Sequence, residues 1–280
     1  MCIFATVVTL ASLAGVGVGQ TVSIDVHAHR GGAGLAPENT LAAFRNALAL
    51  GVDVLEMDLH VSADGEIVVI HDPTLERTTN GRGFVQATPL AELQRLDSGA
   101  WFSARFAGER IPTLREVLGM VRVAGDSRVR LNLETKYDTR GPAPPAEFEA
   151  RVVQVLREAG WLGRAIIQSF HYASLARVKA LEPTLPTAAL RLPANPAPDP
   201  VAVVRAARAD IYSPNFQVIT RETIEALHQA GIPVVLWTVN DPAAMERLLD
   251  AGVGTLRGDG IITDYPDRLT QLLRAKGLRR

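Results

Sequence analysis

The chain of 280 residues contains one cysteine, Cys2, which lies inside an apolar N-terminal segment. The remaining sequence therefore can form no disulfide and offers neither a thiol nucleophile nor a cysteine metal ligand. Lysine and arginine number 29 against 30 aspartate and glutamate residues, and no basic run with interleaved aromatic residues is present. This charge balance gives no indication of a nucleic-acid partner.

The first 24 residues carry no charged side chain. Residues 2–19 are small or apolar and end in Gly17-Val18-Gly19, a small-x-small cleavage pattern. We therefore expect residues 1–20 to be a signal peptide and the mature protein to be exported, periplasmic or extracellular, although no lysine or arginine precedes the apolar run. A misassigned start codon, which would leave the protein cytoplasmic, and a weak membrane anchor are the alternatives. Several glycines disfavour a transmembrane helix, so we expect no stable membrane insertion.

Residues 21–280 have the pattern of one α/β domain. Short apolar strands alternate with amphipathic helices along this part of the chain, which is typical of a parallel sheet buried on both faces. About eight such units, in a chain of this length, predict a (β/α)8 TIM barrel. An open, doubly wound sheet is the alternative, but it more often carries a G-x-G-x-x-G loop, and that motif is absent.

Residues 73–110 interrupt the alternation and predict a small insertion after the second strand, with a short helix over 89–99. The stretch EIVVIHD, residues 66–72, is expected to extend the region of the second strand. Other helices have clear boundary signals. Thr113 and Glu116 have capping-box spacing, Gly51 closes the first helix, and Asp241-Pro242 begins a late one.

Paired polar residues at strand positions suggest a metal site. Glu56 and Asp58 are two residues apart in an apolar strand, so both carboxylates face the same side. Two inward carboxylates repel each other and lose hydration, and a divalent cation offsets both costs. Glu134 and Lys136 repeat this spacing and share their face with Asn132. Salt bridges to neighbouring basic residues are the alternative for both pairs.

The stretch DVHAHRGG, residues 25–32, allows two interpretations. His27 and His29 could form the H-x-H pair with which many barrel metal hydrolases begin. Alternatively, the unit is His29-Arg30-Gly31: a catalytic histidine, a phosphate-binding arginine and a glycine that lets a ligand come close. His71, followed by Asp72 at another strand end, could act as a general acid or base.

The available ligands favour a hard cation. Carboxylate, carbonyl and water ligands suit Mg²⁺ or Ca²⁺, and a site poor in histidine argues against zinc. The chain has only six histidines: His27, His29, His60, His71, His171 and His228. An H-x-H amidohydrolase site would need a second histidine after a middle strand, and it would leave the three carboxylates unexplained. We expect His228, in the middle of a helix, to lie on the surface.

A family resemblance accounts for these residues together. The stretch AHRGGAGLAPENTLAAFRNALALGVDVLEMDLHVSADGEIVVIHDPTLERTTNGRG, residues 28–83, resembles the signature half of the glycerophosphodiester phosphodiesterase family. Later stretches are also similar: LNLETK, IIQSF, VVLWTVN and GDGIITDYP. The resemblance extends over nearly the whole mature chain, and the motifs in this order are specific. Two features are unusual for the family: the HAH lead-in and residues 255–257, which look like extra residues before the last strand.

The resemblance implies a TIM barrel that hydrolyses glycerophosphodiesters to glycerol 3-phosphate and an alcohol. It implies the following roles: His29 and His71 as the acid–base pair, Arg30 and Lys136 as phosphate ligands, Glu56, Asp58 and Glu134 as ligands of one divalent cation, Glu38 as support for Arg30 or the metal site, and Trp237 as a wall of the substrate pocket. His27 is then interpreted as a structural residue. Attack by the glycerol hydroxyl, giving a cyclic phosphate, and direct attack by water both stay open, as does the order in which the histidines act.

Three other functions stay open at this point. A lysophospholipid or phospholipid phosphodiesterase on the same barrel is the main alternative, but it should carry an amphipathic basic helix, and none is evident. A non-catalytic binder of phosphodiesters would be expected to lack a histidine or a carboxylate of the set. The metal amidohydrolase is the third. The expected partner is a small-molecule diester, and the sequence predicts no oligomeric state.

Overall fold

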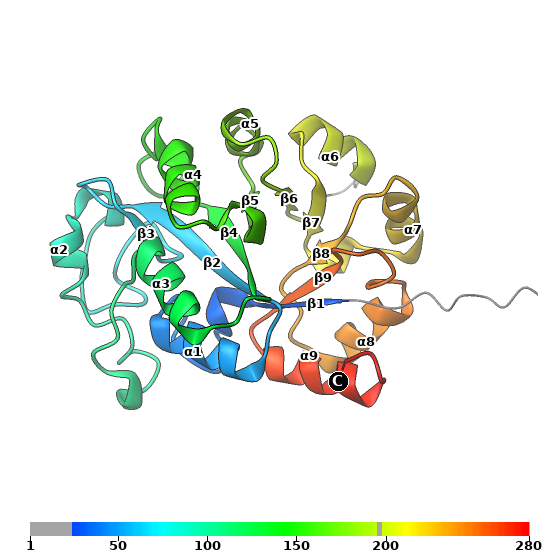
Figure 1. The fold of residues 1–280 in the computed structure, drawn as a ribbon, viewed down its shortest axis with the longest axis horizontal. Helices are drawn as coiled ribbons and strands as arrows, with labels where there is room; N and C mark the ends of the chain where they lie inside the picture. Colours follow the sequence, from blue (N-terminus) through cyan, green and yellow to red (C-terminus); the bar gives the residue numbers. More distant parts are fainter. Residues whose placement is uncertain (1–23, 195–197, 280) are drawn as a thin grey trace, which may run out of the picture.

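The strands of the protein form a parallel barrel (Figure 1). The computed structural model describes residues 24–194 and 198–279, so the expected signal peptide lies outside it. Within these ranges the barrel strands are β1 Asp25–Ala28, β2 Val54–Val61, β4 Arg130–Thr135, β5 Ala165–Ser169, β6 Thr187–Arg191, β7 Ile211–Pro214, β8 Val235–Leu236 and β9 Gly260–Thr263. Neighbouring strands pair in the order β7-β6-β5-β4-β2-β1-β9-β8. Isolated parallel bridges, Tyr212 with Val234 and Asn215 with Trp237, connect β7 to the β8 region. The predicted (β/α)8 barrel is confirmed.

Helices surround the barrel on its outside (Figure 1). They are α1 Leu41–Leu50, α3 Leu114–Ala124, α4 Phe148–Glu158, α5 Tyr172–Leu181, α6 Pro200–Ala207, α7 Arg221–Gln229, α8 Pro242–Asp250 and α9 Pro266–Ala275. In the described part of the chain, no helix combines the length and apolar character needed to cross a membrane.

The predicted helix boundaries follow from local hydrogen bonds. The Thr113 side chain accepts a hydrogen bond from the Glu116 amide, and the Glu116 carboxylate accepts one from the Thr113 amide, so the capping box that begins α3 is confirmed. The helix α1 ends at Gly51, which has the left-handed φ of 73° that glycine tolerates. Asp241 caps α8, and Pro242 occupies its first turn, as predicted.

The segment after β2 departs from the parallel pattern. Ile67–Val69 forms β3, which pairs antiparallel with β2, so EIVVIHD turns back along that strand rather than extending it. The helix expected over 89–99 is confined to α2, Leu90–Leu93, because the residues after it form turns. This segment lies at one side of the barrel in Figure 1. It has an apolar core of its own, made of Val68, Ile70, Leu75, Val85, Leu93 and Ile111.

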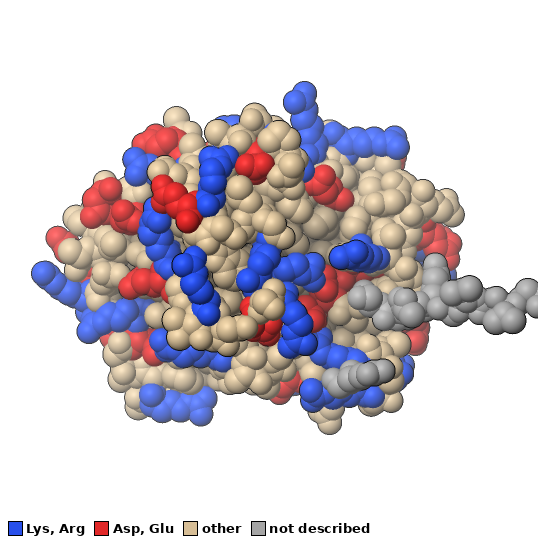
Figure 2. Space-filling model, in the orientation of Figure 1, with Lys and Arg blue, Asp and Glu red and all other residues tan. Residues whose placement is uncertain are grey.

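Strand alternation separates two environments. On β2, Leu55, Met57 and Leu59 belong to the large core beneath the helices, whereas Glu56 and Asp58 point to the barrel interior. On the face of the molecule that Figure 2 shows, charges of both signs are interspersed, with no extended basic patch. The carboxylates of Glu56 and Asp58, in contrast, are buried inside the barrel.

Candidate active site

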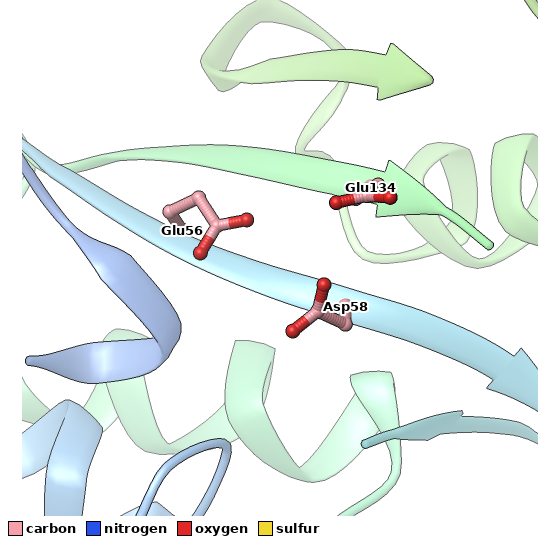
Figure 3. A group of neighbouring side chains, drawn as sticks. All are labelled: Glu56, Asp58 and Glu134. Atoms are coloured by element: carbon pink, nitrogen blue, oxygen red, sulfur yellow. The ribbon is translucent and has the colours of Figure 1, made fainter. Parts of the chain in front are cut away.

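Three carboxylates meet between β2 and β4. In the strand register Asp58 lies opposite Glu134, and Glu56 lies opposite Asn132. Each carboxylate offers one oxygen, and these three oxygens all lie within 4.8 Å of one another. All three residues are buried, and their carboxylates face one another across the two strands (Figure 3). The structure thus brings together the three residues predicted to bind a metal.

The electrostatics of this cluster fit a cation. Burial raises the pKa of Glu56 to about 8, and the neighbouring charge of Asp58 adds to the rise. Burial also raises the pKa of Glu134, against the opposing charge of Lys136. Asp58 is ionised, because Lys136 and Arg30 outweigh its burial and hold its pKa well below the usual range. Its Oδ1 atom is buried and makes no hydrogen bond. A divalent cation would relieve this crowding, so the residues fit a hard metal ion.

Neutral donors fix two of the three carboxylates. Asn39 Nδ2 donates to Asp58 Oδ2 at 2.8 Å, and Gln168 Nε2 donates to Glu56 Oε1 at 2.8 Å. Asn132 in turn donates to Gln168 at 2.9 Å. Asn39 and Gln168 were not predicted as residues of the site. The only available signal was that each lies in a stretch that resembles the family.

The two predicted phosphate ligands lie beside the cluster. Arg30 is in the short 3-10 turn η1, His29–Gly31, where its φ is 51°. Its amide donates to Glu56 at 2.7 Å, its guanidinium donates to Glu38 at 2.8 Å, and its Nε lies 3.4 Å from Asp58. Lys136 Nζ donates to Glu134 at 2.8 Å. Arg30 contacts Glu38, the residue expected to support it, and the phosphate-binding role stays a prediction.

Gly31 lies close against the helix α1. Its φ is +85°, and a Cβ atom there would lie 2.8 Å from Ala43 Cβ and 3.0 Å from Phe44. Both neighbours belong to α1, so the glycine lets η1 pack against this helix. The expectation that Gly31 also lets a ligand come close stays a prediction.

Each of the two predicted catalytic histidines is held by a carboxylate. Asp264 lies 2.6 Å from His29 Nδ1 and itself accepts from Asn240. Asp72 lies 2.6 Å from His71 Nδ1. Such contacts fix each ring and assign the Nδ1 proton, which leaves Nε2 to exchange protons.

The two rings have opposite pKa shifts. Burial alone would lower the pKa of His29, but the hydrogen bond to Asp264 and the charge of Glu56 outweigh it, so the pKa is raised. Burial lowers the pKa of His71, and the charge of Lys136 contributes in the same direction. A pair shifted in opposite directions suits one proton donor and one proton acceptor.

His27 does not join the metal cluster. It is fully buried, and burial lowers its pKa to about 3, so the ring is neutral. Its Nδ1 lies 3.5 Å from Asn132 Nδ2. The three clustered ligands come from Glu56, Asp58 and Glu134. The structure thus favours His29-Arg30 as the functional unit, with His27 as a buried residue below it.

Trp237 packs beside Phe170 and the barrel interior. Its ring packs edge-on against Phe170, with the ring centroids 5.5 Å apart, and its Nε1 donates to the Ser213 carbonyl at 2.7 Å. It also packs against the apolar cluster that fills part of the barrel interior. Trp237 is partly exposed and Phe170 is 42% exposed, so both are accessible to a bound molecule. The role of Trp237 in the pocket stays a prediction.

The expected surface position of His228 is wrong. Its side chain is 15% exposed, and its Nε2 lies 3.1 Å from the fully buried Asp259. Its Nδ1 lies 3.2 Å from the Thr255 hydroxyl. Asp259 also accepts hydrogen bonds from the amides of Val234 and Gly254. The residues that look extra before the last strand therefore form an ordered loop around Asp259.

Comparison with known proteins agrees with this geometry. Residues 29–268 match the model of the glycerophosphoryl diester phosphodiesterase family. A glycerophosphodiester phosphodiesterase of Caldanaerobacter subterraneus is 40% identical, over 90% of this chain and 98% of the relative. The crystal structure of a putative glycerophosphoryl diester phosphodiesterase from Silicibacter pomeroyi has a TM-score of 0.82 at 32% identity, covering 92% of this chain and 95% of that one. A phosphodiesterase of Oleispira antarctica, solved in complex with the product sn-glycerol-3-phosphate, has a TM-score of 0.78 at 32% identity, over 89% of this chain and 96% of that one. The chain belongs to the glycerophosphoryl diester phosphodiesterase family.

Proposed function

We propose that the protein hydrolyses glycerophosphodiesters to glycerol 3-phosphate and an alcohol. The observation that carries the proposal is the meeting of three buried carboxylates and two cationic side chains with two carboxylate-held imidazoles, of which one follows β1 and the other follows β3. The Oleispira antarctica relative binds sn-glycerol-3-phosphate as its product, which supports the same product here.

Glu56, Asp58 and Glu134 would hold one divalent cation, which we propose to be Mg²⁺ or Ca²⁺ because every ligand is a carboxylate. When bound, the cation would polarise a phosphoryl oxygen and stabilise the charge that develops on it. Hydrogen bonds from Asn39, Gln168 and the Arg30 amide would hold the carboxylates of Asp58 and Glu56 in place for this task.

Arg30 and Lys136 would bind the phosphate. Each lies against a carboxylate of the triad, so a phosphate bound next to the triad would lie within reach of both side chains. Charge-assisted hydrogen bonds from these cations would strengthen as negative charge builds on the phosphoryl oxygens.

His29 and His71 would transfer the protons. Asp264 and Asp72 hold the Nδ1 atoms, so each ring presents Nε2 for exchange with the substrate. One imidazole would accept the proton of the nucleophile, either water or the neighbouring glycerol hydroxyl, while the other would protonate the leaving oxygen of the alcohol. If the glycerol hydroxyl attacks, water would then open the cyclic phosphate to give glycerol 3-phosphate. Trp237 and Phe170 would bound the pocket on the side away from the charged residues. We also propose, from the apolar N-terminal stretch alone, that the protein is exported.

A coupled assay of glycerol 3-phosphate release from glycerophosphocholine tests the proposal. The purified protein is stripped of metal and assayed after addition of Mg²⁺, Ca²⁺ or Zn²⁺. Glu56→Gln should lower kcat by about 10³-fold, because it removes a ligand of an ion whose effect is several kcal/mol. The matched control is Glu66→Gln, an exposed carboxylate beside β3.

Release that requires Mg²⁺ or Ca²⁺, is lost in Glu56→Gln and persists in Glu66→Gln would support the proposal. Release with Zn²⁺ alone would overturn the assignment of the cation. Release from lysophosphatidylcholine but not from glycerophosphocholine would replace the proposed substrate by a lipid.

A further inference from the structure

Arg77 connects the two sides of the site although it lies in the insertion. Its guanidinium donates to both oxygens of Asp72, from Nε at 2.7 Å and from Nη2 at 3.2 Å. It also donates to both oxygens of Glu38, from Nη1 at 2.9 Å and from Nη2 at 2.7 Å. Its side chain is 42% exposed, whereas those of Glu38 and Asp72 are only 8% and 12% exposed. One partly exposed arginine thus joins two nearly buried carboxylates.

Each of these carboxylates holds a different functional side chain. Asp72 lies 2.6 Å from His71 Nδ1, and Glu38 accepts from the guanidinium of Arg30 at 2.8 Å. A continuous chain of charged contacts therefore runs from His71 through Asp72, Arg77 and Glu38 to Arg30. Resting on the proposed function, we infer that Arg77 is a positioning residue that fixes the His71 ring and the Arg30 guanidinium relative to each other.

The chemistry of the link requires an arginine. Two carboxylates that face a common cation repel each other if that cation is removed, and neither is exposed enough for water to screen it fully. A planar guanidinium with five donors can form two-point contacts with both, whereas the ammonium of lysine is a compact charge at the end of a flexible stem. Arg140, the other cation near Asp72, is 3.9 Å away and pairs with Asp138 at 2.5 Å, so it does not replace Arg77.

Steady-state kinetics on Arg77→Gln, Arg77→Lys and the exposed control Arg82→Gln provide the first test. Removing a residue that orients a functional side chain, without touching the reacting atoms, typically lowers activity by about 10–100-fold. We therefore expect kcat/KM of Arg77→Gln to fall by this factor. Arg77→Lys should recover less than half of that loss on a logarithmic scale, and Arg82→Gln should match the wild type. If Arg77 merely stabilises the insertion, the lysine variant, once folded, will restore full activity.

A double-mutant cycle tests the chain of contacts. If Arg77 acts through Glu38, then Glu38→Gln and Arg77→Gln combined should cost less than the product of their separate effects on kcat/KM. Fully multiplicative effects would overturn the inference, because residues that act through one another do not behave independently.

A proton resonance provides a readout that does not require activity. The His71 Nδ1 proton in its 2.6 Å contact with Asp72 should appear far downfield in the ¹H NMR spectrum, identified by its absence in His71→Gln. We expect it to broaden into exchange with water in Arg77→Gln and to persist in Arg82→Gln. An unchanged resonance in Arg77→Gln would refute the positioning role. If the wild type releases no glycerol 3-phosphate, the proposed function fails, and this resonance alone decides whether Arg77 orders His71.

Discussion

The interior of the barrel has two unlike halves. One half, contributed mainly by β1, β2 and β4, holds polar side chains: His27, Glu56, Asp58, Asn132, Glu134 and Gln168. The other half, contributed by β5 to β9, holds an apolar cluster of Ile166, Ala188, Ile211, Val235 and Ile262, with Trp237 packed against it. The strands of both halves present apolar side chains outward to the helices, so only their inner faces differ.

The two halves should contribute unequally to the stability of the fold. Buried carboxylates near one another are unfavourable without a compensating cation, so the polar half is not expected to contribute much to folding. The strands that carry it are held from outside, as β2 is by Leu55, Met57 and Leu59. The apolar half and the outer core therefore stabilise the fold and offset the unfavourable contribution of the polar half to the free energy of folding.

The largest expected effect is on activity alone. His29→Asn removes one of the two histidines proposed to transfer protons, so we expect kcat to fall by about 10²- to 10⁴-fold. The melting temperature measured by circular dichroism should change little, because the ring is replaced by a smaller polar group near the mouth of the barrel. A variant that keeps more than a tenth of the wild-type kcat would exclude His29 from the acid–base pair.

A substitution in the apolar half should lower stability and leave activity nearly unchanged. Ile211 is 6% exposed in the apolar half, and Ile211→Ala should lower the free energy of unfolding by about 2–5 kcal/mol, measured in urea. Under conditions where the variant is folded, its kcat should stay within a few-fold of the wild type. A tenfold loss of kcat with little loss of stability would show that the two halves are not separable in this way.

The sequence pattern was enough to predict one of these halves well. Spacing of two on a strand fixes which side chains share a face, so the pattern alone assigns Glu56 with Asp58, and Glu134 with Lys136, to one side. The barrel itself followed from the alternation of strands and helices. The hairpin formed by β3 was not predicted because an apolar strand pattern carries no information on the direction of pairing.

The contacts that hold the site together were mostly not predictable. Arg77 lies 39 positions from Glu38, and Gln168 lies 112 positions from Glu56; each is an ordinary polar residue in its local pattern. Asp264 ends the last strand, but its partner His29 lies 235 positions away. Such pairings depend on barrel closure and on the insertion, which local patterns do not specify. The prediction for His228 was wrong for the same reason, since its partner Asp259 comes from a distant loop.

Lowering the pH should show what the burial of His27 in the polar half costs in stability. Burial lowers its pKa to about 3, whereas an unfolded chain protonates histidine near pH 6.5. Below pH 6.5 the unfolded state therefore binds a proton that folded His27 does not, and the contribution of His27 to stability falls as the pH falls towards 3, with a slope that approaches about 1.4 kcal/mol per pH unit.

Urea unfolding between pH 7 and pH 5 checks this expectation. His27→Asn should have a smaller loss of stability over that range than the wild type. His171→Asn, which replaces an exposed histidine, should stay closer to the wild-type slope. Equal slopes for the wild type and His27→Asn would mean that His27 is not the buried neutral group responsible.

The smallest expected effect comes from a helix cap outside the barrel interior. Thr113→Ala removes the capping box at the start of α3, whose hydrogen bonds involve only Thr113 and Glu116. The free energy of unfolding should fall by about 1 kcal/mol, as for other threonine caps, and kcat should not change because the cap contacts neither interior cluster. Urea unfolding and the glycerol 3-phosphate assay on one preparation measure both quantities. This variant provides the background for comparing His29→Asn with Ile211→Ala. If so small a loss of stability lowered kcat, the loss of activity in His29→Asn could not be attributed to the missing imidazole.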